Sequence, residues 1–241
     1  MQAPPPNIEF GALPRQTKYG DGTFPRHEDA WPLIDRKVWK PVSLNRHVRS
    51  IYDQLDGMCT SNGACQTMMV ERSFRGRLRN PELNAEYLYY LHSKWGDGST
   101  LDENLRALID SGVNARLVAN DRRAANRMLE AIDLNADFDA VATALQRGHP
   151  CLVGVIWPGS TRRRGHAICV TELEKGVGEW HIRGPNSWGE DWGEQPDYTP
   201  EELRWLEAKG YRPLTGGFYT LTERECADFA TFGCWAAGSS T

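Results

Sequence analysis

The chain has 241 residues, of which 40% are hydrophobic and 25% charged, and this ordinary globular composition argues against wholesale disorder. Its 28 Lys and Arg and 32 Asp and Glu give a formal net charge of −4, so there is no general attraction to nucleic acid or to anionic membranes. No segment approaches the roughly 18 consecutive apolar residues of a membrane span, and none is predicted.

The first 30 residues are rich in proline, glycine and charge, and they predict an extended arm that wraps around the protein or frays. We place the arm at residues 1–47 and a single domain at 48–241. The first residues carry neither the basic nor the apolar segment of a secretory signal. This predicts a cytoplasmic location, and it leaves association with a virion or export by another route open.

Helical patterns dominate the first half of the domain. After the loop that contains Gly57, apolar side chains at helical spacing and the absence of proline predict a helix from Cys59 to Phe74. Cys59 is therefore expected in the first turn of a helix. Further helices are predicted over 81–93 with Pro81 near the start, over 101–109 before Gly112, and over 138–145 between Asp137 and Gly148.

Strand patterns dominate the second half. Strands are predicted over 151–157, 166–171, 179–183 and 217–221. Between the last two, Thr199-Pro-Glu-Glu202 is a capping box that starts a short helix closed by Gly210. Helices followed by strands predict the α+β fold class, with a cleft where the two halves meet.

The cysteines do not suggest a disulfide framework. A chain of this length without an export signal favours reduced thiols, most of them small buried core residues. The absence of a Cys-x-x-Cys pair argues against a structural zinc site. We therefore predict no metal and no cofactor. The six cysteines are Cys59, Cys65, Cys151, Cys169, Cys226 and Cys234.

Two other patterns imitate functional motifs. The acidic segment 133–139 begins like a calcium loop, but Phe138 and Ala144 replace the glycine and the glutamate that such a loop needs. It is interpreted as the start of a helix. The basic run at 162–164 is interpreted as a solvated hairpin tip, with a contact to an acidic substrate or partner as the alternative.

Three stretches combine into one chemical hypothesis. A thiol becomes an effective nucleophile when a helix N-terminus and a nearby imidazolium stabilise the thiolate. The same imidazole then protonates the leaving amine, and a third group holds the ring in place. The stretches are Asp53-Gln-Leu-Asp-Gly-Met-Cys59, Gly165-His-Ala-Ile168 and Asn186-Ser-Trp-Gly-Glu-Asp-Trp-Gly-Glu194.

Together these stretches resemble the papain-like (C1) cysteine peptidases, in particular their bacterial and phage branch. The match runs from about residue 48 to 221, most of the chain. The resemblance implies a two-lobed fold, with a helical lobe at about 48–135, an antiparallel β lobe at about 136–241 and the active site between them. It also implies a cysteine endopeptidase that cleaves a peptide or protein substrate through a thioester acyl-enzyme.

The resemblance assigns a role to five side chains. Cys59 is the nucleophile, His166 the acid and base, and Asn186 the group that orients the histidine. Gln54 matches the side chain that forms the oxyanion hole with the backbone N–H of the cysteine. Trp188 matches the indole that shields the His–Asn hydrogen bond from water.

The chain also departs from the family pattern. The interval from Gln54 to Cys59 is five positions, where six is usual. About twenty residues between 194 and 216 look inserted, and the 58 residues before Cys59 are too few for a long inhibitory propeptide. Two alternatives therefore stay open. One is a hydrolase of cell-wall peptide crosslinks. The other is a catalytically weak structural or binding module of a phage particle or a delivered complex, whose assembly partner is unknown.

Overall fold

The computed structural model describes residues 10–15, 22–54, 57–77, 82–91, 98–113, 127–128, 130–157, 165–228 and 232–238. Within these ranges the helices are α1 (His27–Ala30), α2 (Cys59–Phe74), α3 (Ala85–Tyr90), α4 (Leu101–Asp110), α5 (Phe138–Gln146) and α6 (Pro200–Ala208). Short 3₁₀ turns are η1 (Arg36–Val38), η2 (Asn45–His47) and η4 (Glu225–Asp228).

The strands of the described residues form two four-stranded sheets, in which all pairings are antiparallel. One has the order β1 (Val42–Ser43), β5 (Glu172–Lys175), β6 (Trp180–Pro185), β7 (Phe218–Thr222). The other has the order β2 (Glu130–Asp133), β8 (Cys234–Gly238), β3 (Cys151–Val155), β4 (His166–Val170). Only Thr171 separates β4 from β5, so the chain passes directly from one sheet to the other.

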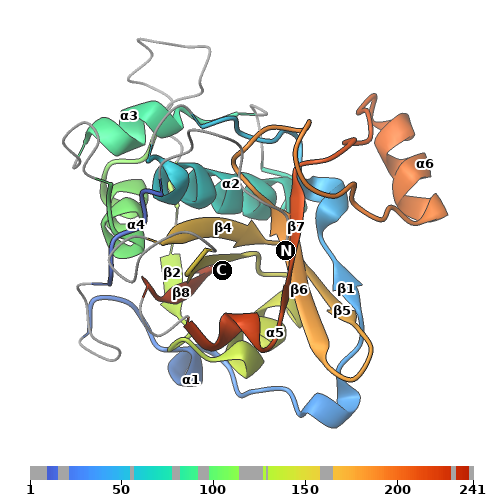
Figure 1. Ribbon diagram of the computed structural model, residues 1–241, viewed down its shortest axis with the longest axis horizontal. Helices are drawn as coiled ribbons and strands as arrows, with labels where there is room; N and C mark the ends of the chain where they lie inside the picture. Colours follow the sequence, from blue (N-terminus) through green and yellow to red (C-terminus); the bar gives the residue numbers. More distant parts are fainter. Residues whose placement is uncertain are drawn as a thin grey trace.

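Helix α2 is the centre of the molecule and packs along β4, with α3 and α4 on its other side (Figure 1). Its residues from Cys59 to Glu71 are all buried. Gly63 permits this close packing, because a Cβ there would lie 2.8 Å from Cδ1 of Leu152 on β3. The packing brings the N-terminus of α2 to the start of β4, which begins at His166.

Several predicted elements are confirmed. The helix from Cys59 to Phe74 has the predicted bounds. Helix α5 begins after Asp137, whose side chain accepts a hydrogen bond from the backbone N–H of Asp139, so the calcium-like segment is the start of a helix. Helix α6 has the predicted capping box at Thr199. The α+β fold class is also confirmed.

The helix predicted over 81–93 is shorter than expected. It begins at Ala85, because the side chain of Asn84 accepts a hydrogen bond from the backbone N–H of Tyr87 and caps it. It ends at Tyr90. Pro81 and residues 92–93, which the prediction included, lie outside the described residues.

Four strands were not predicted. β1 and β5 pair with each other, and β2 pairs with β8 over more than 100 residues of intervening chain, from Glu130 opposite Gly238 to Asp133 opposite Trp235. These strands are four or five residues long, or two in β1, and they lack a clear alternation. Their pairing comes from partners remote in the sequence, which local patterns do not report.

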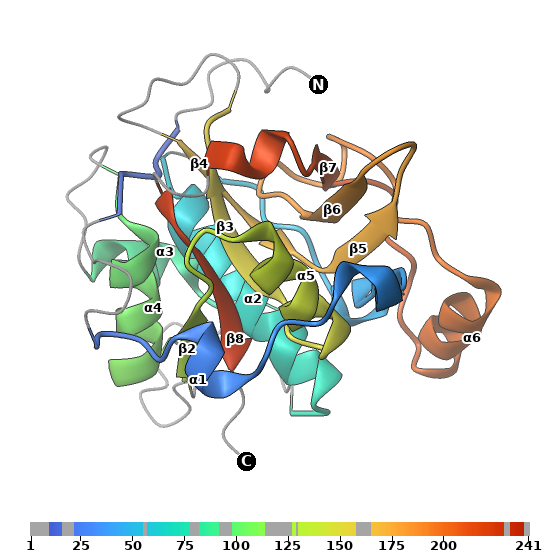
Figure 2. The ribbon, with the colours of Figure 1, turned by 90° about the horizontal axis from the view of Figure 1, so that it is seen from below.

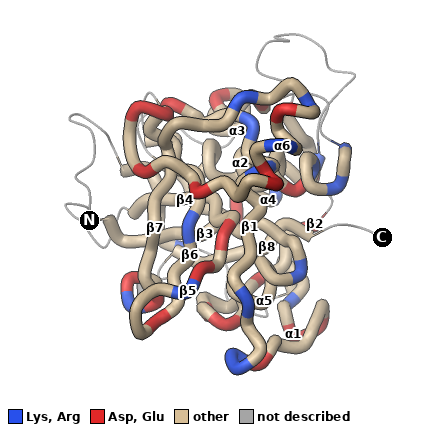
Figure 3. The backbone as a smooth tube through the Cα atoms, turned by 90° about the vertical axis from the view of Figure 1, so that its right-hand side faces the viewer, with Lys and Arg blue, Asp and Glu red and all other residues tan. Residues whose placement is uncertain are grey.

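The predicted insertion between residues 194 and 216 contains α6, which lies at the edge of the molecule in two perpendicular views (Figures 1 and 2). It contacts the turn η2 of the N-terminal part. Acidic and basic residues are both scattered along the chain that faces the viewer in a third view (Figure 3).

All six cysteines are buried and none forms a disulfide. Among the described residues, no cluster of three or more His, Cys, Asp or Glu is placed to hold a metal ion. No helix in the described ranges is long and apolar enough to cross a membrane. The basic run at 162–164 lies outside the described residues.

Candidate active site

Cys59 is the first residue of α2, and its side chain is fully buried. The helix N-terminus places partial positive charge near the sulfur, which is where a thiolate is stabilised. Part of the surroundings of Cys59 comes from residues 10–15 of the N-terminal part, which we call the cleft segment. Backbone groups of Ala167, Gly11, Ala12 and Thr60 lie close enough to the Cys59 side chain to favour its ionised form.

The cleft segment joins the two halves of the molecule by backbone hydrogen bonds. Ala12 and Gly165 exchange two of them, with N–O distances of 3.0 and 2.7 Å. On the other side, the N–H of Leu13 donates to the carbonyl of Ser99 at 3.0 Å, and the N–H of Ser99 donates to that of Gly11 at 2.9 Å. The segment therefore lies as an added strand between the residue before His166 and the residue two positions before α4.

The close approach of the cleft segment requires glycine. A Cβ on Gly11 would lie 1.5 Å from the carbonyl oxygen of Gly57, two residues before the candidate nucleophile. A Cβ on Gly98, whose φ is +72°, would lie 2.3 Å from the carbonyl oxygen of Gly11. No other residue type fits at Gly11 unless the backbone moves.

Side chains hold both ends of this segment. Phe10 makes edge-on contacts with the rings of His166 and Trp188, at centroid distances of 6.1 and 6.3 Å. Arg15 forms a salt bridge with Asp133 of β2 in which both side chains are largely buried. The segment is thus fixed to His166 and Trp188 by aromatic contacts and to β2 by an ion pair.

His166 and Asn186 form the second part of the site. The Nε2 atom of His166 donates to Oδ1 of Asn186 at 2.6 Å, and both side chains are buried. Because the amide oxygen only accepts, this contact places the proton of a neutral ring on Nε2 and leaves Nδ1 as the acceptor. The backbone N–H of Asn186 donates to the carbonyl of Gly217, which ties it to the start of β7.

Trp188 covers this pair. Its ring lies 4.5 Å from that of His166 between centroids, and its exposed fraction is 4%. Behind it, the rings of Trp157, Trp192 and Tyr219 form a continuous aromatic cluster with centroid distances of 4.3–6.0 Å. The cluster excludes water from the His–Asn contact. Trp192 is buried there as well.

Gln54 lies beside the stretch of chain that carries Ser187 and Trp188. Its backbone N–H donates to the carbonyl of Ser187 at 2.8 Å, and its Oε1 accepts from the Ser187 hydroxyl. Asp53 also pairs with Trp188 as an isolated β-bridge. The hydroxyl contact orients the amide of Gln54, with Nε2 on the opposite side. The interval from Gln54 to Cys59 is one position shorter than is usual in the family. Residues 55–56 of this interval lie outside the described residues.

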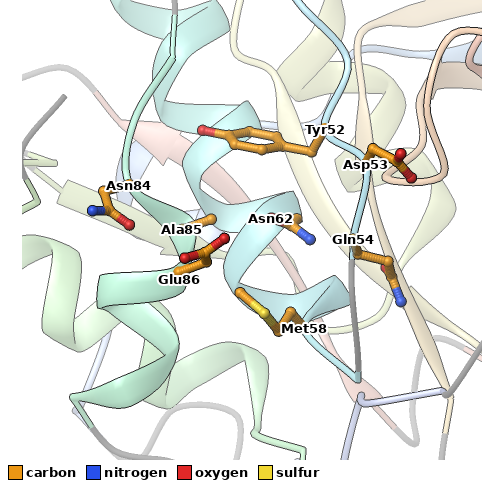
Figure 4. A pocket seen from close by; sticks show the side chains of 8 residues that line it. All are labelled: Tyr52, Asp53, Gln54, Met58, Asn62, Asn84, Ala85 and Glu86. Carbon is orange, nitrogen blue, oxygen red and sulfur yellow. The ribbon is translucent and has the colours of Figure 1, made fainter. Parts of the chain in front are cut away.

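A small cavity opens next to this part of the site, between the first turn of α2 and the start of α3 (Figure 4). Gln54, Met58 and Asn62 line one side, and Asn84 and Glu86 line the other. Its volume is about 10 Å³, roughly the room for one water molecule. In this form of the protein it cannot hold a substrate side chain.

The two candidate acid–base groups are both dehydrated. Burial raises the pKa of the Cys59 thiol, and the four neighbouring backbone groups only partly oppose this. Burial also lowers the pKa of His166 to about 4, against the hydrogen bond to Asn186. At neutral pH the pair is therefore a thiol and a neutral imidazole. No hydrogen bond joins them in the described residues, and Nδ1 of His166 has no partner there.

The comparisons with known proteins identify the architecture. A scan of protein families finds no match to this chain, and no curated protein matches it. Solved structures do match. Xylellain, a cysteine protease from Xylella fastidiosa, superposes with a TM-score of 0.66 at 14% identity, over 96% of each chain. The chain has the papain-like fold.

Two further structures agree with this assignment. ProCathepsin B S9 from Trypanosoma congolense has a TM-score of 0.65 at 13% identity and covers 95% of this chain and 86% of its own. Digestive procathepsin L 3 of the Tenebrio molitor larval midgut has a TM-score of 0.61 at 17% identity, with coverage of 86% and 73%. The papain-like fold expected from the sequence motifs is confirmed.

Sequence reasoning missed the residues of the N-terminal part that lie against Cys59 and His166. It treated Phe10, Gly11 and Ala12 as part of an arm that wraps or frays, without a role at the site. It also missed Trp157, which contacts the ring of His166 at 5.3 Å. A signal existed for Trp157, since it ends the predicted strand 151–157. No local sequence pattern marks the cleft segment, because it is held mainly by backbone hydrogen bonds to Gly165 and Ser99.

Proposed function

We propose that this chain is a papain-like cysteine endopeptidase, and that the structure holds its closed form. One observation carries the proposal: the N-terminus of α2 places Cys59 beside Ala167, next to a His166 ring that Asn186 holds in one tautomer under Trp188. This combination supplies an ionisable thiol, a base of defined orientation and a water-excluding cover.

In the proposed reaction the Cys59 thiol first gives its proton to Nδ1 of His166. The thiolate then attacks the carbonyl carbon of the scissile amide, and the carbonyl π electrons move to the oxygen. The backbone N–H of Cys59 and the Gln54 amide donate hydrogen bonds to this oxyanion, each worth about 2.7–4 kcal/mol in the transition state. The electrons return, the C–N bond breaks, and His166 gives its proton to the leaving amine.

The product of this first half is a thioester on Cys59. A water molecule then attacks the thioester carbon and loses a proton to His166. The C–S bond breaks, the acid product leaves and the thiolate–imidazolium pair is restored. Asn186 keeps the ring oriented throughout, because its oxygen accepts from Nε2 in both protonation states of the ring.

The cleft segment explains why Cys59 and His166 are shielded from water in the described form. Its backbone at Gly11 and Ala12 lies beside the Cys59 side chain, where a substrate backbone would have to bind. It also takes the backbone groups of Ser99 and Gly165 that border the nucleophile. We infer that substrate reaches Cys59 only after this segment leaves.

The test is labelling by a thiol-directed epoxide, followed by mass spectrometry of the modified peptide. The protein is tested full length and without residues 1–15. We expect the shortened protein to react at Cys59 and to hydrolyse a denatured protein substrate. Cys59→Ala abolishes both.

Cys65→Ala is the matched control, since Cys65 is also a buried thiol of α2 whose pKa is raised by burial. It should label like the parent. Labelling that persists in Cys59→Ala contradicts the assignment of the nucleophile. Labelling at Cys59 with hydrolysis of peptidoglycan but no protein substrate favours the cell-wall alternative. Labelling at Cys59 without hydrolysis of peptidoglycan or of the protein substrate favours the catalytically weak structural or binding module.

A further inference from the structure

A second pocket lies at the other end of α2. It has a volume of about 490 Å³, within the usual range for small-molecule sites. One wall comes from the segment around η2, with Arg46 and Arg49. The opposite wall comes from α6 and the residues after it, with Trp205, Lys209 and Tyr211. We call it the basic-aromatic pocket.

The pocket is far from the proposed active site. Ser73, which lines its floor, lies 14 residues after Cys59 on the same helix, and this corresponds to about 21 Å at 1.5 Å per residue. A ligand here does not touch the substrate bond. The pocket also depends on the inserted helix α6, which stands apart from the body of the molecule (Figure 2).

Its cationic groups lack carboxylate partners. Among the described residues, no salt bridge involves Arg46, Arg49 or Lys209. The guanidinium of Arg49 donates to the Ser73 hydroxyl at 3.0 Å and to the carbonyl of Arg46 at 2.6 Å, both uncharged acceptors. Glu71, one turn before the end of α2, pairs with Arg75.

The positive charge of Arg49 is unfavourable in the free protein. Arg49 is partly buried, and burial lowers its pKa because no carboxylate offsets the lost hydration. Burial and the charges of Arg46 and Arg49 also lower the pKa of the neighbouring His47 to about 4. An anion in the pocket would restore the missing counter-charge.

The aromatic side chains add a second recognition element. The guanidinium carbon of Arg49 lies 4.8 Å from the ring centroid of Trp205 and 4.0 Å from that of Tyr211, and that of Arg46 lies 5.7 Å from Trp205. These stacks hold the guanidinium planes in place. Guanidinium groups match carboxylate and phosphate oxygens in pairs, and the rings offer flat apolar surface beside them.

We propose that the basic-aromatic pocket binds a small organic anion, in which a carboxylate or phosphate group is joined to a planar apolar body. Arg46, Arg49 and Lys209 bind the oxyanion, and Trp205 and Tyr211 contact the body. This inference does not rest on the proposed hydrolase activity, because it concerns only binding at a separate site.

The experiment is calorimetric titration of the full-length protein, in a phosphate-free buffer of low ionic strength, with phenyl phosphate, phenylacetate, inorganic phosphate and benzyl alcohol. We expect at least one of the two aromatic anions to bind with a Kd of about 1 mM or tighter. Inorganic phosphate binds more weakly because it lacks the ring, and neutral benzyl alcohol shows no binding. Phenyl phosphate and phenylacetate distinguish a phosphate ligand from a carboxylate ligand.

Three variants complete the test. Arg49→Gln weakens the binding of the anion roughly tenfold or more. Lys209→Gln, at an exposed position that cannot disturb the core, weakens it roughly fivefold. Lys175→Gln, an exposed lysine at the end of β5, leaves the affinity unchanged. The proposal is overturned if neither aromatic anion binds, if benzyl alcohol binds equally well, or if Arg49→Gln and Lys209→Gln both retain the parent affinity.

Discussion

The two parts of the candidate active site are held in different ways. His166, Asn186 and Trp188 are fixed by a buried side-chain hydrogen bond and by a cluster of packed aromatic rings. The cleft segment is held mainly by four backbone hydrogen bonds, each of which contributes only about 0.5–1.5 kcal/mol net. We infer that the first part belongs to the core and that the second is a cover that leaves without unfolding it.

Because of this difference, the orientation of the His166 ring and the access of water to the site should depend mainly on different residues. We expect the orientation of the His166 ring to depend mainly on Asn186, whose backbone is tied to Gly217, and less on the edge-on contact with Phe10. We expect hydration of the thiol and the imidazole to depend on the cleft segment, because it lies against both residues. A change in the segment should therefore alter how often the site opens, whereas a change in the aromatic part should alter the chemistry after opening.

Removal of residues 1–15 should have the largest effect. It deletes the four backbone hydrogen bonds, so the rate of epoxide labelling at Cys59 rises by on the order of 1,000-fold. The measurement is the labelling rate by mass spectrometry. Far-ultraviolet circular dichroism should report the same fold. An unchanged rate would mean that the segment does not control access.

Gly11→Ala tests the same cover with a single methyl group. Its Cβ would lie 1.5 Å from the carbonyl oxygen of Gly57, so the segment must shift away. We expect labelling to rise by on the order of 100-fold. Pro14→Ala, at an exposed position of the same segment of chain, is the control and should leave the rate close to that of the parent.

Asn186→Ala tests the other part. In the protein without residues 1–15, loss of the acceptor for Nε2 frees the His166 ring to adopt wrong orientations, and kcat for a peptide substrate falls roughly 50-fold. KM changes little, because Asn186 is expected to act through the histidine. In the full-length protein, protection of the cleft segment from hydrogen exchange should be the same as in the parent. A loss of that protection would show that the two parts are coupled.

Lower pH should loosen the cover. With the segment in place, burial lowers the pKa of His166 to about 4, and in the open form it returns toward about 6.5. In Cys59→Ala, where no thiol can pass its proton to the ring, the open form binds more protons between these two values, so opening becomes more favourable as the pH falls, by up to about tenfold per pH unit. Hydrogen exchange at the amides of Ala12 and Leu13, corrected for the intrinsic rate, measures this. Equal protection at pH 7 and pH 5 would contradict it.

Arg15→Gln should have the smallest effect. The salt bridge to Asp133 holds the far end of the segment, but the backbone hydrogen bonds at Ala12 remain. We expect labelling about fivefold faster than in the parent. Arg26→Gln, which removes an exposed ion pair with Asp29, is the control and should have no effect on the rate.

The features that could be predicted from the sequence are those with local signals. Helical spacing placed Cys59 at the start of α2, and side-chain capping predicted the starts of α5 at Asp137 and of α6 at Thr199. The motif residues His166 and Asn186 were predicted as partners, and they form a hydrogen bond in the structure. Their catalytic roles remain predictions.

The features that could not be predicted depend on remote partners. Strand β8 pairs with β2 and β3 along its backbone, and the short segment 234–238 alone carries no clear strand pattern. The cleft segment is similar, because the N–H and carbonyl groups of Ala12 are matched by those of Gly165 through the fold. Backbone pairing of this kind is independent of side-chain identity, apart from the need for glycine at residue 11.

The cleft segment is attached to the same chain as the site that it covers, and this attachment affects how strongly it is held there. In the proposed closed form it competes with substrate as part of the same chain, so its strength includes an effective concentration on the order of millimolar or higher. A free peptide with the sequence of residues 10–15 makes the same few contacts without that advantage. Such a peptide should therefore be a poor inhibitor in trans. A single cut between the segment and the domain would then act as an irreversible release, because the liberated piece diffuses away and is diluted.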